Sequence, residues 1–209
     1  MERRPRRPAM LDAQTAERIV GDIDPALRSQ AAHATADVIV RRGRDGSDDP
    51  ELVARLVGLV DVEGLEAVAE LWSQSPPRTL PGSLWRLYLI REWVRADPAV
   101  VADRFRLGRS HADVAGVIAG VVEPPGPADV SRLADAVLAG VYEGELDVAL
   151  DRAAAFVRVV ATGAAFDADW IAESDDALAD RVTRRASALL GTAADLEGAA
   201  ELWRAGRLD

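Results

Sequence analysis

The stretch Ser83-Leu-Trp-Arg-Leu-Tyr-Leu-Ile-Arg-Glu-Trp-Val-Arg-Ala96 decides the fold class of this chain. Its bulky side chains Trp85, Leu89 and Trp93 recur every four residues, which is the spacing of one face of an α-helix. Ser83 can cap this helix, because a serine hydroxyl accepts a hydrogen bond from a free backbone N–H at a helix start. We therefore predict a helix that begins just after Ser83 and buries these three side chains together in the core.

Helical spacing extends outward from this segment over nearly the whole chain. Apolar residues recur at intervals of three and four, and the Asp-Pro pairs at 24–25, 49–50 and 97–98 are typical of helix starts. No segment requires a strand. We predict an all-α fold, an irregular multi-helix bundle of about ten helices with no sheet. The expected helices lie near 10–19, 25–43, 50–60, 62–73, 84–96, 98–107, 114–122, 127–142, 146–162, 175–190 and 193–205.

Proline-rich and charged stretches predict the domain organisation. Residues 1–9 carry four arginines and no apolar periodicity, so we expect a disordered basic arm there. Glu123-Pro-Pro-Gly-Pro127 is the stiffest interruption in the chain. It separates an N-terminal helical half, residues 10–122, from a C-terminal helical half, residues 128–209. The two halves are either separate subdomains or one continuous domain, and the sequence favours neither.

The residue types that most enzyme sites need are scarce in this chain. It has no cysteine, no lysine and two histidines, which excludes thiolate nucleophiles, sulfur-ligated zinc and Schiff-base lysines. Neither His33 nor His111 has a second histidine at helical spacing, and no Gly-x-Ser-x-Gly turn presents a serine. We expect no catalytic residue, no metal and no cofactor, and this elimination favours a protein that is not an enzyme.

The distribution of apolar and basic residues indicates where the protein works. The start of the chain is basic but lacks the apolar stretch of an export signal, and Val114 to Val122 is shorter than the roughly 20 residues that span a membrane. We therefore expect a cytoplasmic protein without a membrane partner. All 25 basic residues are arginine, a bias typical of GC-rich bacterial genomes.

A basic segment raises the possibility of DNA binding. Residues 78–109 hold seven arginines against three acids, although the whole chain has a net charge of −10. Gly108 resembles the turn glycine of a helix-turn-helix motif over 97–122, which would place Arg104, Arg106 and Arg109 on phosphates. The expected second helix, however, offers no side chain that donates to base edges. Nucleic acid is therefore a disfavoured partner, and DNA-binding regulation is the second hypothesis.

Arg86 is the unusual residue of the tryptophan-rich segment, because it projects into the middle of the apolar arc. A buried arginine must be paired, since removing its charge from water costs several kcal/mol. We expect an ion pair with a carboxylate of the preceding helix, such as Glu70. Exposure at the helix end and an anion or ligand site are the alternatives.

Elimination leaves three hypotheses for the function. The first is a non-enzymatic helical interaction or regulatory protein, which uses an exposed helix face to bind a protein partner or a second copy of itself. The second is the DNA-binding regulator described above. The third is a small-molecule binder or enzyme with a pocket lined by Trp72, Trp85, Tyr88 and Trp93.

The charge of the chain gives a first testable prediction. We expect no mobility shift of a generic DNA duplex at physiological salt, because the net charge of −10 repels a polyanion. A gel-shift titration measures this. Tight binding of a genomic fragment would contradict the prediction if its affinity fell steeply with added salt and if Arg104→Ala with Arg109→Ala flattened that dependence.

Overall fold

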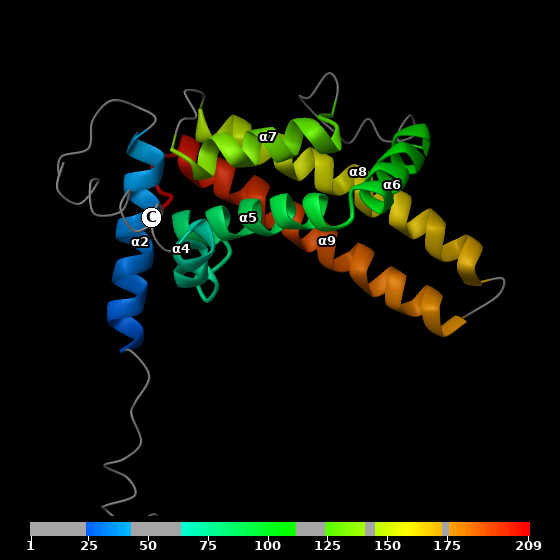
Figure 1. Ribbon diagram of the computed structural model, residues 1–209, viewed down its shortest axis with the longest axis horizontal. Coiled ribbons are helices and arrows are strands. Elements are labelled where there is room, and N and C mark those ends of the chain that lie inside the picture. Colours follow the sequence, from blue (N-terminus) through cyan, green and yellow to red (C-terminus); the bar gives the residue numbers. More distant parts are fainter. Residues whose placement is uncertain (1–23, 43–63, 112–123, 141–144, 173–175) are drawn as a thin grey trace, which may run out of the picture.

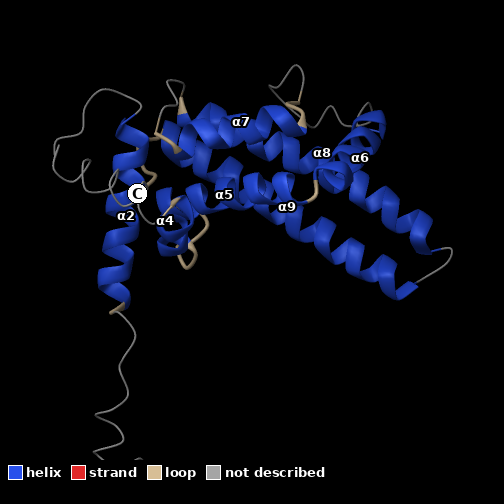
Figure 2. Cartoon of the chain, viewed as in Figure 1, coloured by secondary structure: helices blue, strands red, loops and turns tan. Residues whose placement is uncertain are grey.

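The computed structural model describes residues 24–42, 64–111, 124–140, 145–172 and 176–209, with the terminal residues of some helices described by their backbone alone. Within these ranges the fold is all-α, as predicted, with seven helices and no strand (Figure 1, Figure 2). The helices are α2 (Pro25–Arg42), α4 (Leu65–Trp72), α5 (Leu80–Ala96), α6 (Pro98–His111), α7 (Pro127–Leu138), α8 (Leu146–Ala172) and α9 (Asp176–Arg204).

The expected number of about ten helices is not matched in the described residues. Three expected helices, near 10–19, 50–60 and 114–122, lie outside them, as does the basic arm over 1–9. The two helices expected over 175–190 and 193–205 are one continuous helix, α9. Gly191 lies within it, exposed to solvent, and a single exposed glycine lowers helix stability without breaking the helix.

A long hairpin of α8 and α9 forms the scaffold of the fold (Figure 1). Two arginine–carboxylate contacts tie the helices together at different points along their length. Arg158 donates two hydrogen bonds to the carboxylate of Glu197, each 2.6 Å long, and Arg204 donates to Asp147 at 2.7 Å and to Asp151. Both helices contribute alanine and other apolar side chains to the buried core, among them Ala153, Phe156, Val157, Val160, Ala193, Leu196, Ala199 and Ala200.

Two glycines let α6 cross α8 at very short distance. A Cβ atom on Gly108 would lie 1.9 Å from the carbonyl oxygen of Val159, and one on Gly163 would lie 1.9 Å from that of Arg104. The backbones can approach this closely only because neither glycine has a side chain. The expectation that Gly108 ends its helix is therefore wrong, because α6 continues through it to His111.

Helix α5 begins earlier than its sequence indicates. Its N-cap is Thr79, whose hydroxyl accepts a 3.2 Å hydrogen bond from the backbone N–H of Gly82. Pro81 lies in the first turn, where a missing N–H costs little. Ser83 is not the cap; it is buried, and its hydroxyl donates to the carbonyl oxygen of Leu80 at 2.8 Å.

The buried face of α5 also differs from the prediction. Leu89 is 45% exposed and the two neighbouring tryptophans are half-buried, so Trp85, Leu89 and Trp93 are not buried together. The core instead takes the row Leu84, Leu87, Ile90 and Val94. Both rows have helical spacing, and the packing of α2, α4 and α7 on α5 selects one of them.

Helices from both sides of the 123–127 interruption pack together, α5 on α7 and α6 on α8. Buried side chains from α2 to α9 belong to one apolar cluster. The division into 10–122 and 128–209 stays a prediction, which expression of each half alone would test. Among the described helices, none combines the length and the apolar character that a membrane crossing requires.

The glycine crossing gives a prediction for stability. Gly163→Ala should lower the free energy of unfolding by about 1–3 kcal/mol, because the new methyl group forces α6 and α8 apart. Gly191→Ala is the matched control, since nothing lies within 4 Å of a Cβ there. It should raise stability by up to about 1 kcal/mol through helix propensity. Urea denaturation measures both, and an equal gain for both variants would contradict the close crossing.

Candidate functional site

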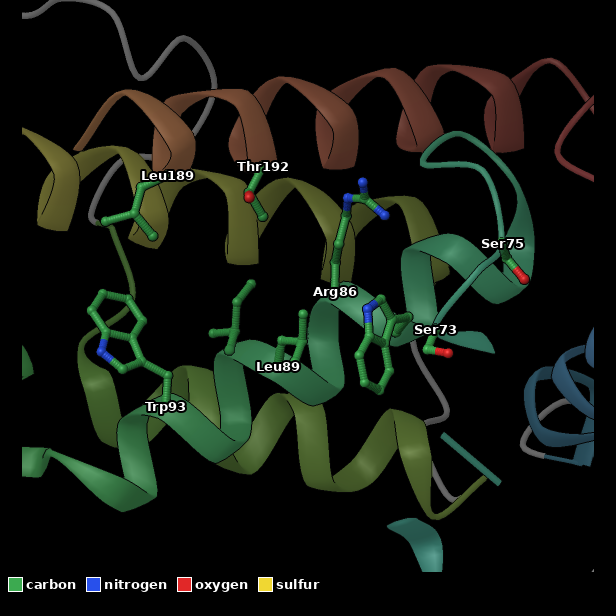
Figure 3. Close-up of a pocket in the computed structure, with 9 residues that line it drawn as sticks. Ser73, Ser75, Arg86, Leu89, Trp93, Leu189 and Thr192 are labelled. Carbon is green, nitrogen blue, oxygen red and sulfur yellow. The ribbon is translucent and has the colours of Figure 1, made fainter. Parts of the chain in front are cut away.

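An open groove of about 350 Å³ lies between α5 and α9 (Figure 3). Its size falls near the lower limit of roughly 300 Å³ for ligand-binding pockets. Trp93 and Leu189 lie at one end, and Ser73 and Ser75, from the connection between α4 and α5, lie at the other (Figure 3). The full lining is Ser73, Ser75, Trp85, Arg86, Leu89, Ile90, Trp93, Leu189 and Thr192.

The apolar wall of the groove is a face of α5 at the edge of the core, where Trp85 and Trp93 pack against the core but stay half-buried. Trp85, Leu89 and Trp93 follow one another at helical spacing along this face. Leu189 lies on the opposite wall, in α9 (Figure 3). Buried Ile90 also lines the groove. A row of large apolar side chains at the surface is typical of an interaction site.

Arg86 connects the two walls of the groove. Its Nε and Nη2 donate to Oδ2 of Asp195 on α9 at 3.2 and 3.0 Å, and its Nη1 donates to the carbonyl oxygen of Gly82 at 3.0 Å. The expected ion pair is therefore present, but its partner is Asp195 instead of Glu70. All three donating nitrogens of Arg86 have partners within the chain.

Two of the four residues predicted for an aromatic pocket line the groove, and two do not. Trp85 and Trp93 contribute their indoles to the lining. Trp72 is fully buried, and its indole N–H donates to the hydroxyl of Thr35 at 3.0 Å, which ties α4 to α2. Tyr88 lies outside the lining and stacks on Trp85, with ring centroids 5.5 Å apart.

Tyr88, which stacks on Trp85, lies near several carboxylates. Burial is the main cause that raises the pKa of the Tyr88 hydroxyl, Glu92, Glu66 and Glu70 raise this pKa further, and Arg91 opposes them with an effect larger than that of Glu70. A negative field has this effect because it disfavours the phenolate. Glu66 and Glu70 are exposed residues of α4.

The arginines predicted to contact an anion or DNA are not brought together. Arg86 belongs to the groove, whereas Arg104, Arg106 and Arg109 lie on α6. Arg106 donates to Asp103 at 2.6 Å. Arg104 is mostly buried, with its Nη2 3.6 Å from Asp167, and its Nε has no hydrogen-bond partner among the described residues.

Sequence reasoning missed the wall of the groove that α9 contributes. Leu189 and Thr192 lie about 100 residues from α5 in the chain, and no local pattern relates them to it. The described residues also include no group of three or more histidine, cysteine or carboxylate side chains placed to hold a metal ion.

Comparison with known proteins gives no family, because no protein-family model, no curated protein and no solved structure matches this chain. The function is therefore inferred from the geometry of the groove.

The position of Leu89 gives a second stability prediction. Leu87→Ala should cost about 2–5 kcal/mol, because this side chain is fully buried and its loss leaves a cavity. Leu89→Ala should cost less than about 1 kcal/mol, since Leu89 already contacts water. Denaturation midpoints measure both. Equal losses would show that the groove is closed over Leu89.

Proposed function

We propose that this protein is a non-enzymatic binding protein, and that its groove between α5 and α9 holds an apolar helix of a protein partner. The observation that carries this proposal is the row of Trp85, Leu89 and Trp93, which lines the groove together with Leu189 of α9. The row spans two turns of α5, or about 12 Å. A partner helix with apolar residues at positions i, i+4 and i+7 presents a matching ridge.

The residue types in the groove favour tight packing with such a partner. Tryptophan is prominent among the side chains that dominate the free energy of protein association, because it buries a large area with few rotatable bonds. Leu89 is 45% exposed, and covering it removes apolar surface from water.

The polar groups of the groove give less support to a small-molecule ligand or to catalysis. Arg86 is held by Asp195, the Ser73 hydroxyl donates to the carbonyl oxygen of Glu70 at 2.8 Å, and the Thr192 hydroxyl donates to that of Ala188 at 3.1 Å. A pocket for a small molecule needs polar groups that converge on the ligand. Within the groove lining, no carboxylate or histidine is present to act as a general base.

DNA binding also receives less support, because most arginines of 78–109 lie beside carboxylates. Arg91 and Arg95 both donate to Asp135 on α7, and Arg86, Arg104 and Arg106 lie next to carboxylates as described above. These acids offset the positive charge that a phosphate backbone requires. The continuous helix through Gly108 also removes the turn on which the helix-turn-helix hypothesis depended.

Affinity capture with matched variants tests the proposal. Leu89→Glu places a charge in the groove, whereas Val148→Glu alters a side chain on α8 that is exposed to nearly the same extent, 46%. We expect at least one protein from the native host to bind the wild type and Val148→Glu, and to be lost with Leu89→Glu. Quantitative mass spectrometry measures this. Retention of every captured protein by Leu89→Glu would contradict the proposal.

A further inference from the structure

We infer that the helix held in this groove is basic at the end next to Ser73, and that an arginine or lysine of the partner lies against the Trp85–Tyr88 stack and Glu70. The inference rests on the proposed function and specifies the chemistry of the partner. It depends on three features at this end of the groove: an aromatic pair, a carboxylate close to the lining, and the lack of an ion pair at that carboxylate among the residues that the structure describes.

The aromatic pair offers a surface suited to a cation. Tyr88 stacks on Trp85 with an angle of 21° between the rings, and Trp85 lines the groove. The face of an indole ring attracts a guanidinium or ammonium group through its quadrupole. The apolar stem of an arginine or lysine can pack on the same surface.

A carboxylate lies directly beside the groove lining. The hydroxyl of Ser73, a lining residue, donates to Oε1 of Glu70 at 3.4 Å as well as to the Glu70 carbonyl oxygen. Glu66 lies one turn earlier on α4, and both glutamates are exposed. A cation that reaches Ser73 is therefore within reach of Glu70 and attracted by Glu66.

Neither glutamate is neutralised within the part of the chain that the structure describes. No ion pair forms at Glu66 or Glu70 there, whereas Arg86 and Arg91 of α5 have other partners. Arg86 is held by Asp195, and Arg91 is held by Asp135 and Glu92. Burial is the main cause of the raised pKa of the Tyr88 hydroxyl, and the charges of Glu92, Glu66 and Glu70 add to it.

Selection from a peptide library tests the inference on the full-length protein. A displayed library of helical peptides about 16 residues long, or four turns, is selected on the wild type. Peptides that also bind the Leu89→Glu variant are removed. Peptides that bind the Leu189→Glu variant, altered on the opposite wall, are removed in a second step. Thermal melts check that both variants fold. We expect selected peptides to carry apolar residues at i, i+4 and i+7, with arginine or lysine enriched in one terminal turn.

The best selected peptide, made synthetically, is then the probe for affinity measurements. Replacing both glutamates, Glu66→Gln with Glu70→Gln, should weaken its binding about five- to tenfold and reduce the salt dependence of its affinity. Glu201→Gln is the control, because it removes an exposed carboxylate of α9 outside the groove lining. It should leave the affinity unchanged.

The outcomes separate the two proposals. Peptides that require Leu89 but show no basic enrichment, or that bind the double variant as tightly as the wild type, would overturn the inference and leave the proposed function standing. If no peptide depended on Leu89, both would fail. Enrichment of acidic residues at either end would also overturn the inference.

Discussion

The ion pair between Arg86 and Asp195 fixes how α5 sits on α9, and the groove depends on it. Taking a guanidinium out of water is costly unless its donors find partners, so an arginine at this position of α5 requires an acceptor across the interface. Asp195 and the carbonyl oxygen of Gly82 supply it. This contact holds the Trp85 row of α5 beside α9, while the packing of α2, α4 and α7 on α5 buries the Leu84 row.

The scaffold that holds α9 in position combines small residues with charged contacts. Both α8 and α9 bury alanines in the core, while Arg158 and Arg204 pair with carboxylates along the hairpin. The Gly108–Gly163 crossing then fastens α6 to α8. Near the end of α9, Gly206 has a positive φ of 65°, and the N–H of Arg207 bonds to the carbonyl oxygen of Leu202 at 2.8 Å, which closes the helix in a Schellman motif.

The sequence predicts the class of the fold but not its contacts. Helical period is a local property, so the all-α class follows from it. Of the four residues predicted for an aromatic pocket, Trp85 and Trp93 line the groove. Which face of α5 is buried does not follow, because two apolar rows lie side by side and distant helices choose between them. Asp195 could not be found either, because it lies 109 residues from Arg86. From the sequence, Gly108 fits the end of a helix as well as its interior. Only the close approach of α6 to Val159 of α8 explains why a glycine stands at this position.

The walls of the groove come from helices far apart in the sequence, so the groove exists only in the folded chain. Binding of a partner in the groove is therefore thermodynamically linked to folding. An unfolded chain has no groove, so a partner binds only the native state and shifts the folding equilibrium toward it. At a partner concentration of about 100 times Kd this linkage is worth about 2.7 kcal/mol, a large share of the stability of an ordinary domain. Within the proposed function, the lifetime of this chain in a cell would then follow the supply of its partner, because proteases act on the unfolded fraction.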